Sequence, residues 1–180
     1  KSVAMMQLQY KYDCNFRCKH CAIEKFKQTD GRLLTIPDVK NIADQADAMG
    51  LSSICLSGGE PLMFDDLEQV VEAIGPDRFN IAMDTNGWLM TEDNVKRLID
   101  IGVDRVQLSI DGLKESHDGF RGANKSWEKC IEALKNCKKY GFRVIINVVV
   151  TKSMMKSGAI IPYLDHLSQY GEHISIIHAK

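Results

Sequence analysis

Three cysteines lie close together near the start of the chain, where their spacing could serve chemistry. Cys14, Cys18 and Cys21 are spaced CxxxCxxC, whereas the others are scattered in apolar surroundings and are interpreted as core residues: Cys55, Cys130 and Cys137. In a reducing compartment, a tight group of thiols indicates metal binding more than disulfides. Structural zinc generally takes four protein ligands, and no second cysteine pair follows at finger-like spacing. Three thiolates instead suit a 4Fe-4S cluster whose open iron can bind a substrate or cofactor.

A second group with potential chemistry is the segment Gly58, Gly59, Glu60 and Pro61, which directly follows an apolar, strand-like stretch. The two glycines permit a ligand to approach the backbone closely. A carboxylate at the carboxyl end of a parallel strand lies where barrel active sites form. The same residues also suit a tight strand-to-helix turn, and this alternative stays open.

Small polar residues also end the next two apolar stretches. Thr85 and Asn86 precede a glycine after the third stretch, and Ser109 and Asp111 end the fourth. Turn formation alone also explains both glycine-containing segments. Arg121 follows about a dozen residues later, and its planar guanidinium is suited to hold a carboxylate through two hydrogen bonds.

Three further polar residues have a structural and a functional interpretation. His117 and Asp118 resemble an acid-base pair, but with Gly119 beside them we expect them to stabilise the connecting segment. Asn147 interrupts the apolar run from 144 to 150, so its side chain needs a polar partner. That partner is either a bound ligand or neighbouring barrel side chains.

The elements that position these residues are predicted from hydrophobic periodicity. Six apolar segments with many β-branched residues alternate with five amphipathic helical segments, which predicts an α/β fold with parallel strands and right-handed crossovers. Six strands are fewer than the eight of a complete barrel, so a partial (β/α)6 TIM-like barrel, buried on both faces of its sheet, fits best. The predicted strands are Met5–Tyr10, Ser53–Leu56, Asn80–Met83, Val106–Ile110, Val144–Val150 and Ile174–Ile177.

The helix boundaries are also predicted from local sequence. Thr35, Thr91 and Ser126 are placed where N-cap residues belong. The stretch from Asp111 to Lys125 is predicted to be an unusually long connection, and long ordered connections in compact domains tend to be functional.

Composition limits the possible partners and location. The chain has 180 residues, 44% of them hydrophobic, with a net charge of -1, so no overall field attracts it to nucleic acid or to an anionic membrane. It has no apolar run of the roughly 18 residues that span a bilayer. We therefore expect a soluble, cytoplasmic protein with a peptide or small-molecule partner. Because the chain begins at Lys1 and stops within a strand pattern, residues 1–180 are expected to be one domain, truncated from a longer enzyme.

In this order and at these strand ends, the motifs CxxxCxxC, GGEP, TNG and SxDG resemble those of the radical S-adenosylmethionine (SAM) superfamily. They are most similar to the SPASM/twitch-like branch of sulfatase-maturing, peptide-modifying and cofactor-building enzymes. The resemblance extends from Cys14 to at least Val150. It implies that Cys14, Cys18 and Cys21 bind the 4Fe-4S cluster, and that SAM binds the open iron through its amino and carboxylate groups.

The resemblance also implies roles for the other residues. Gly58, Gly59 and Glu60 would receive the methionyl ammonium of SAM, while Ser109 and Arg121 would bind its carboxylate. The remaining residues expected to contact SAM are Thr85, Asn86, Asp111 and Asn147. No side chain is expected to be catalytic, because the cofactor carries the radical chemistry.

The activity implied by the resemblance is reductive cleavage of SAM to a 5′-deoxyadenosyl radical, which abstracts a hydrogen atom from a substrate. The expected substrate is a ribosomal peptide or protein side chain, with a small biosynthetic intermediate as the alternative. The expected electron donor is a low-potential protein of the flavodoxin or ferredoxin type. Two alternatives of another class are a zinc-stabilised binding module and a noncatalytic iron-sulfur electron carrier.

Overall fold

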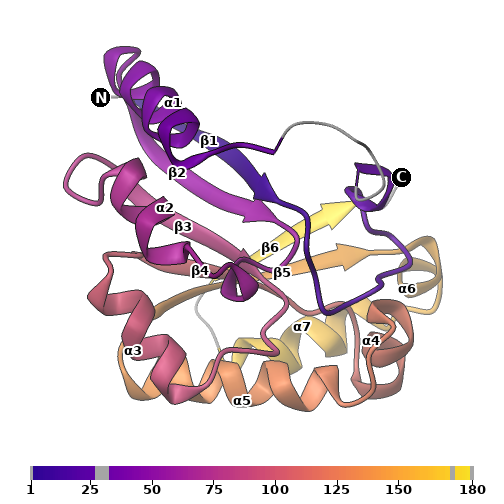
Figure 1. Ribbon diagram of the computed structural model, residues 1–180. Coiled ribbons are helices and arrows are strands. Elements are labelled where there is room, and N and C mark those ends of the chain that lie inside the picture. The colour runs from indigo at the N-terminus through magenta and orange to yellow at the C-terminus, as the bar shows by residue number, and fades with distance from the viewer. Residues whose placement is uncertain (1, 27–32, 171–172, 179–180) are drawn as a thin grey trace.

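All six predicted strands form one parallel sheet. The computed structural model describes residues 2–26, 33–170 and 173–178, and its strands lie side by side in chain order (Figure 1). Each strand pairs in parallel with its sequence neighbour, and the sheet is not closed, since β1 and β6 are its two edges. This confirms the α/β partial barrel. The strands are β1 (Ser2–Lys11), β2 (Leu51–Gly58), β3 (Asn80–Thr85), β4 (Arg105–Ser109), β5 (Arg143–Val150) and β6 (His173–His178).

The five predicted helices are present, and each follows one of the first five strands. They are α1 (Ile36–Ala48), α2 (Leu67–Ile74), α3 (Glu92–Asp100), α5 (Ser126–Lys139) and α7 (Ile160–Ser168). Their apolar stripes pack against the strands in one hydrophobic core. No helix in the described part of the chain is long and apolar enough to cross a bilayer.

The structure adds elements that periodicity did not predict. They are α4 (Lys114–Arg121), the short α6 (Lys152–Lys156) and the 3-10 turns η1 (Glu24–Phe26) and η2 (Pro61–Met63). The predicted long connection from Asp111 to Lys125 is therefore wrong, because most of it is the helix α4. This helix has no apolar stripe to detect, since its buried residues are the polar His117 and Arg121, one turn apart on the same face.

Two of the three predicted N-caps are confirmed. Thr35 forms a capping box with Asp38, and the Thr91 side chain accepts a hydrogen bond from the backbone N–H of Asn94. Ser126 is instead the first residue of α5, so that prediction is wrong. Its hydroxyl donates to Asp118, 2.7 Å away, and the same carboxylate accepts the N–H of Trp127. A side chain from the preceding helix thus replaces the expected local cap.

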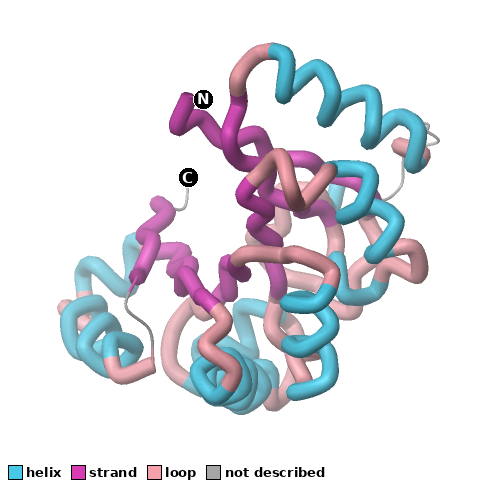
Figure 2. The backbone as a smooth tube through the Cα atoms, turned by 90° about the vertical axis from the view of Figure 1, so that its left-hand side faces the viewer, coloured by secondary structure: helices cyan, strands magenta, loops and turns pink. Residues whose placement is uncertain are grey.

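The two faces of the sheet differ in polarity. Alternate strand residues such as Leu56, Met83 and Ile146 are fully buried under the helices. The other residues form what we call the inner face, where Gln7 is exposed and Gln107 is half-buried. Figure 2 shows the helices on the outer side of the curled sheet. The prediction that the sheet is buried on both faces is therefore confirmed only in part. Cys55 and Ala82 are buried on the inner face, whereas Gln7 is exposed, because no described helix covers this face of the open barrel.

Candidate functional site

The three clustered cysteines lie in the segment that follows β1, which we call the thiol loop (residues 12–23). Cys14, Cys18 and Cys21 are half-buried and form no disulfide. Within the described ranges, no three His, Cys, Asp or Glu side chains are gathered so that they could hold a single metal ion. A cubane cluster binds each thiolate through a different iron, so its ligands do not have to meet at one point.

One side of the thiol loop is held by the turn after β2. The backbone N–H of Gly59 donates to the carbonyl of Lys11, and that of Glu60 to the carbonyl of Asp13, both at 2.8 Å. A Cβ atom on Gly58 would lie 2.1 Å from the Lys11 carbonyl oxygen, and one on Gly59 would lie 1.8 Å from that of Asp13. Both positions therefore require glycine, because the protein's own backbone approaches there.

The other side of the thiol loop is held by the end of α4. The N–H of Lys19 donates to the carbonyl of Phe120 at 3.0 Å, and the rings of His20 and Phe120 stack at 4.2 Å. Gly122 ends the helix with a φ of 67°, and a Cβ atom there would lie 2.7 Å from the carbonyl oxygen of Arg17. The helix missing from the sequence prediction thus positions the cysteines.

Glu60 joins the turns that follow β2 and β3. Its side chain is 1% exposed and accepts hydrogen bonds from the Thr85 hydroxyl and the Asn86 N–H, both at 2.8 Å. Burial raises the pKa of Glu60 to about 7. The Asn86 amide donates to Asn15 at 2.8 Å and lies 3.9 Å from the Cys14 sulfur. These contacts connect the buried carboxylate to the thiol loop.

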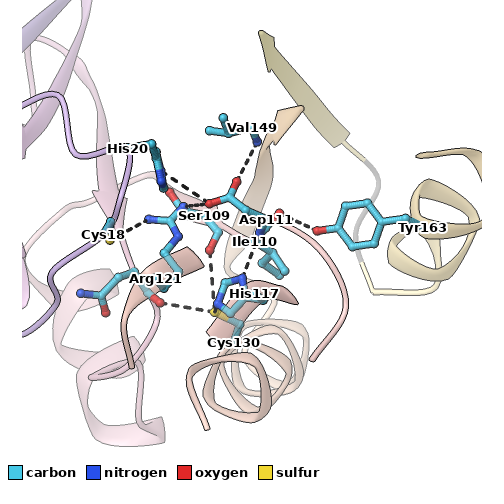
Figure 3. A network of polar contacts seen from close by, with 11 residues as sticks. Cys18, His20, Ser109, Ile110, Asp111, His117, Arg121, Cys130, Val149 and Tyr163 are labelled. Atoms are coloured by element: carbon cyan, nitrogen blue, oxygen red, sulfur yellow. Dashed lines mark hydrogen bonds and ion pairs between the residues drawn. The ribbon is translucent and has the colours of Figure 1, made fainter. Parts of the chain in front are cut away.

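A second buried carboxylate lies at the end of β4 (Figure 3). Asp111 forms an ion pair with Arg121 and accepts the N–H of Val149 at 2.7 Å. Arg121 is 8% exposed, and its Nη1 lies 3.8 Å from the Cys18 sulfur. The guanidinium thus lies between a strand-end carboxylate and a thiol of the cysteine loop.

His117 and Tyr163 hold the strand end that carries Asp111. The N–H of Asp111 donates to His117 Nδ1 at 3.0 Å, so the neutral ring carries its proton on Nε2, 3.8 Å from Cys130 Sγ. Burial lowers the pKa of His117 to about 4. The Tyr163 hydroxyl donates to the carbonyl of Ile110 at 2.5 Å (Figure 3). His117 therefore contacts the segment after β4 that it was expected to stabilise.

Several buried polar atoms near these groups have no hydrogen-bond partner among the described residues. They include His20 Nδ1 and Asp111 Oδ2, the latter held in ion pairs, and also Asn147 Oδ1 and Arg121 Nε. The Asn147 amide nitrogen donates to Gln107 at 3.3 Å, so barrel side chains satisfy part of this residue. A buried polar atom without a partner is costly, and native structures rarely contain one without a reason. One unpaired acceptor and one unpaired donor at the same rim fit a ligand that bears both kinds of group.

Ser109 is half-buried and pairs in register with Asn147, so its side chain shares the inner face. A cavity of about 350 Å³ lies between the thiol loop, α4 and the end of β5. It is lined by Lys19, Asp111, Glu115, Ser116, Gly119, Phe120, Val149, Thr151 and Met154. There is therefore room for a ligand next to the Asp111 carboxylate.

Four inner-face residues were missed as site candidates by the sequence analysis: Gln7, Cys55, Asp84 and Gln107. Cys55 is 1% exposed, as expected of a core residue, but its sulfur accepts a hydrogen bond from Gln107 at 3.0 Å and lies 3.6 Å from Asp84. Its surroundings are therefore polar, contrary to the expectation. Polar residues at alternate positions of a predicted strand are the signal by which such a face could have been found.

We expect Gly59→Ala to lower the free energy of unfolding by about 3 kcal/mol, because the new Cβ would overlap the Asp13 carbonyl. Denaturant titration would measure the loss. Gly119→Ala is the matched control, since nothing lies within 4 Å of its added Cβ and alanine favours the helix. Equal stability of the two variants would contradict this packing.

The raised pKa of Glu60 predicts a pH dependence of stability. The folded protein retains the Glu60 proton up to about pH 7, whereas the unfolded chain loses it near pH 4.5. Stability from this group therefore falls as the pH rises through that range. Unfolding free energies measured without SAM should show this decline for wild type relative to Glu60→Gln. Glu92 is the control, because its pKa is lowered instead, so wild type should show no such decline relative to Glu92→Gln.

Comparison with known proteins identifies relatives over most of the chain. A heme synthase of Methanosarcina barkeri, named as AdoMet-dependent, is 32% identical over 140 residues, which are 77% of this chain and 40% of that protein. A GTP 3′,8-cyclase of Clostridium perfringens is 28% identical over 164 residues, 87% of this chain and 49% of the relative. The chain thus spans less than half the length of these curated relatives.

Solved structures share the fold. SuiB of Streptococcus suis superimposes with a TM-score of 0.78 at 20% identity, covering 98% of this chain and 40% of SuiB. The enzyme anSMEcpe, solved with bound AdoMet, gives 0.78 at 21% identity, covering 98% of this chain and 51% of its own. The model of the radical SAM superfamily matches residues 10–155. With that match across most of its length, the chain belongs to the radical SAM superfamily.

Proposed function

We propose that the chain holds a 4Fe-4S cluster on Cys14, Cys18 and Cys21 and binds SAM beside it for radical chemistry on a substrate. The observation that carries this proposal is that the two buried carboxylates at the strand ends, Glu60 and Asp111, are each connected to the thiol loop by a neighbouring side chain. Asn86 links Glu60 to Cys14, and Arg121 links Asp111 to Cys18. Cluster ligands and candidate cofactor contacts therefore share one rim of the barrel.

The thiol loop suits the cluster electrostatically. Burial raises the pKa of the Cys18 thiol, and the Arg121 guanidinium beside it opposes this rise. A metal-bound thiolate is negatively charged, so a buried cation next to it is stabilising. When bound, the cluster and SAM supply one-electron cleavage of a carbon–sulfur bond and the 5′-deoxyadenosyl radical that abstracts hydrogen. The protein holds the reactants in position and shields them.

Glu60 is the proposed partner of the SAM ammonium. No described cationic side chain forms an ion pair with it, and its hydrogen bonds to Thr85 and Asn86 hold the carboxylate at the rim. A cationic ligand group would favour its ionised form and offset the cost of burial. Gly58 and Gly59 place the backbone next to this carboxylate. Thr85 and Asn86 are then proposed both to position the Glu60 carboxylate and to contact the cofactor.

The carboxylate of SAM, which is bonded to the same methionyl carbon as the ammonium, is assigned to the strand-end groups of β4 and β5. The Arg121 guanidinium, which has an unpaired Nε, is the proposed partner of the SAM carboxylate, and Ser109 lies on the inner face near it. Asp111 orients Arg121 through their ion pair. Asn147 offers its unpaired Oδ1 to a hydrogen-bond donor of the cofactor.

For the whole protein we propose residues 1–180 as the SAM-binding core domain, in the SPASM/twitch-like branch. The proposed substrate is a peptide or protein side chain, supported by neighbours solved with peptides, SuiB with its precursor peptide and anSMEcpe with Cp18Cys. The relatives named as heme synthases and GTP cyclases support a small biosynthetic intermediate as the alternative. The proposed electron donor is a low-potential flavodoxin or ferredoxin.

Anaerobic reconstitution is expected to give about four irons and four sulfides per chain, the content of one cubane cluster. Alanine at Cys14, Cys18 or Cys21 should abolish the cluster, measured by metal analysis and by its broad visible absorption. The double variant Cys130→Ala/Cys137→Ala is the control and should retain it. Equal loss in the control, or one zinc without iron, would contradict the assignment.

Arg121→Ala should weaken SAM binding about ten- to a hundredfold while the cluster stays intact, because one charge-assisted contact to a carboxylate is lost. Arg121→Lys should recover only part of the affinity, since an ammonium cannot form the planar pair of hydrogen bonds. Arg97→Ala, a surface control, should match wild type.

The measurements for these variants are SAM titration of the cluster spectrum and slow release of 5′-deoxyadenosine under dithionite. Unchanged binding in Arg121→Ala would assign Arg121 a structural role only. A full wild-type cluster whose spectrum does not respond to SAM would favour a noncatalytic electron carrier.

A further inference from the structure

A continuous row of hydrogen bonds crosses the inner face of the sheet. Five side chains from five adjacent strands form it, and we call them the inner-face row: Gln7, Cys55, Asp84, Gln107 and Asn147. Asn147 donates to Gln107 at 3.3 Å, Gln107 donates to Cys55 at 3.0 Å, and Cys55 lies 3.6 Å from Asp84 as a thiol donor. From the other side, Gln7 donates to Asp84 at 2.9 Å. The hydrogen bonds of the row therefore run in sequence toward Asp84, which accepts directly from Cys55 and Gln7.

Asp84 differs from carboxylates such as Asp111 and Asp66 because it has no counter-ion among the described residues. Its partners Gln7, Ser57 and Cys55 are all neutral, and no described Lys, Arg or His forms an ion pair with it. By contrast, Asp111 is paired with Arg121, and Asp66 with Lys11 at 2.9 Å. Burial raises the pKa of Asp84, which reflects the cost of a charge that no cation offsets.

The location of Asp84 relates it to the proposed cofactor site. It directly precedes Thr85, whose hydroxyl donates to Glu60, and Glu60 also has no cationic partner among the described residues. Two carboxylates without a described counter-ion therefore lie near each other at this rim. At the far end of the row, Asn147 Oδ1 is an acceptor without a partner. Asp84 and Asn147 thus give the row hydrogen-bond acceptors that a ligand could use.

This pattern indicates what kind of ligand group fits. A carboxylate has about four lone-pair sites, and Asp84 accepts from three neutral side chains, Gln7 at 2.9 Å, Cys55 at 3.6 Å and Ser57, so a further donor is accommodated. A carboxylate or phosphate of a ligand would meet like charge and would be rejected at this position. A cation would supply the counter-ion that no described side chain provides.

We propose that Asp84 binds a positively charged group of the ligand that occupies the inner face. This inference rests on the proposed function, because it takes the inner face as the site of SAM and substrate. Two sources could supply the same chemistry, the sulfonium of SAM or an ammonium or guanidinium of the substrate. The experiment separates them by using a different matched pair of probes for each.

The first arm tests the cofactor. The reconstituted protein is titrated with SAM and with S-adenosylhomocysteine, which keeps the ammonium and carboxylate but has a neutral thioether. If Asp84 binds the sulfonium, Asp84→Asn lowers the ratio of the two affinities about tenfold, mainly through weaker binding of SAM. Asp84→Glu, which retains the charge, should retain part of the preference.

The second arm tests the substrate. Calorimetric titration of the reconstituted, SAM-bound protein with N-acetyl-lysine methylamide and with N-acetyl-norleucine methylamide compares a cation with a neutral side chain of similar length. If Asp84 binds a substrate cation, wild type prefers the lysine probe about tenfold, and Asp84→Asn abolishes this preference. Asp93→Asn, which removes an exposed carboxylate of α3, is the control for net charge and should behave as wild type.

A charge-dependent change in either arm supports the proposal and identifies the source of the cation. If Asp84→Asn changes neither ratio while its cluster content and circular dichroism match wild type, the proposal is wrong. It is equally wrong if Asp93→Asn produces the same change. Failure of the proposed function is distinguishable, because wild type would then carry no cluster or release no 5′-deoxyadenosine with SAM.

Discussion

The backbone from Lys11 to Asp13 passes the turn at Gly58 and Gly59 so closely that no side chain fits between them. A Cβ atom on Gly59 would lie 1.8 Å from the Asp13 carbonyl oxygen, and two backbone hydrogen bonds of 2.8 Å close the contact. Because β1 continues into the thiol loop and β2 into Glu60, this contact determines how the thiols face the buried carboxylate. Thr85 and Asn86 attach to the rim through Glu60, and α4 attaches to it through the thiol loop.

Charge is distributed unevenly over this framework. Asp111 has its counter-ion in Arg121, which also reaches Cys18, so this side of the rim is close to neutral by itself. Glu60 is buried and Asp84 half-buried, neither forms an ion pair with a described cation, and burial raises the pKa of both. Such groups lower stability unless a ligand supplies the missing charge. The thiol loop therefore lies between a compensated carboxylate, Asp111, and an uncompensated one, Glu60.

Much of the fold was predictable because local sequence carries the necessary signals. The strands and the five packing helices follow from apolar periodicity, since each element buries a face against the same core. Thr35 and Thr91 cap their helices as expected, because a cap is formed by residues three positions apart. The motif residues at the strand ends converge because parallel strands place all their carboxyl ends at one rim.

The sequence by itself thus determined the order of strands and helices, the thiol spacing and the family to which the motifs belong. Only the tertiary structure decided that α4 is a helix, that Asp118 replaces Ser126 as the cap of α5, and that the inner face is polar. The reason is physical. A helix whose buried face is His117 and Arg121 has no apolar pattern, and its partners come from distant parts of the chain. Likewise, Gln7 and Asp84 are 77 positions apart, and only the pairing and curl of the strands bring them together.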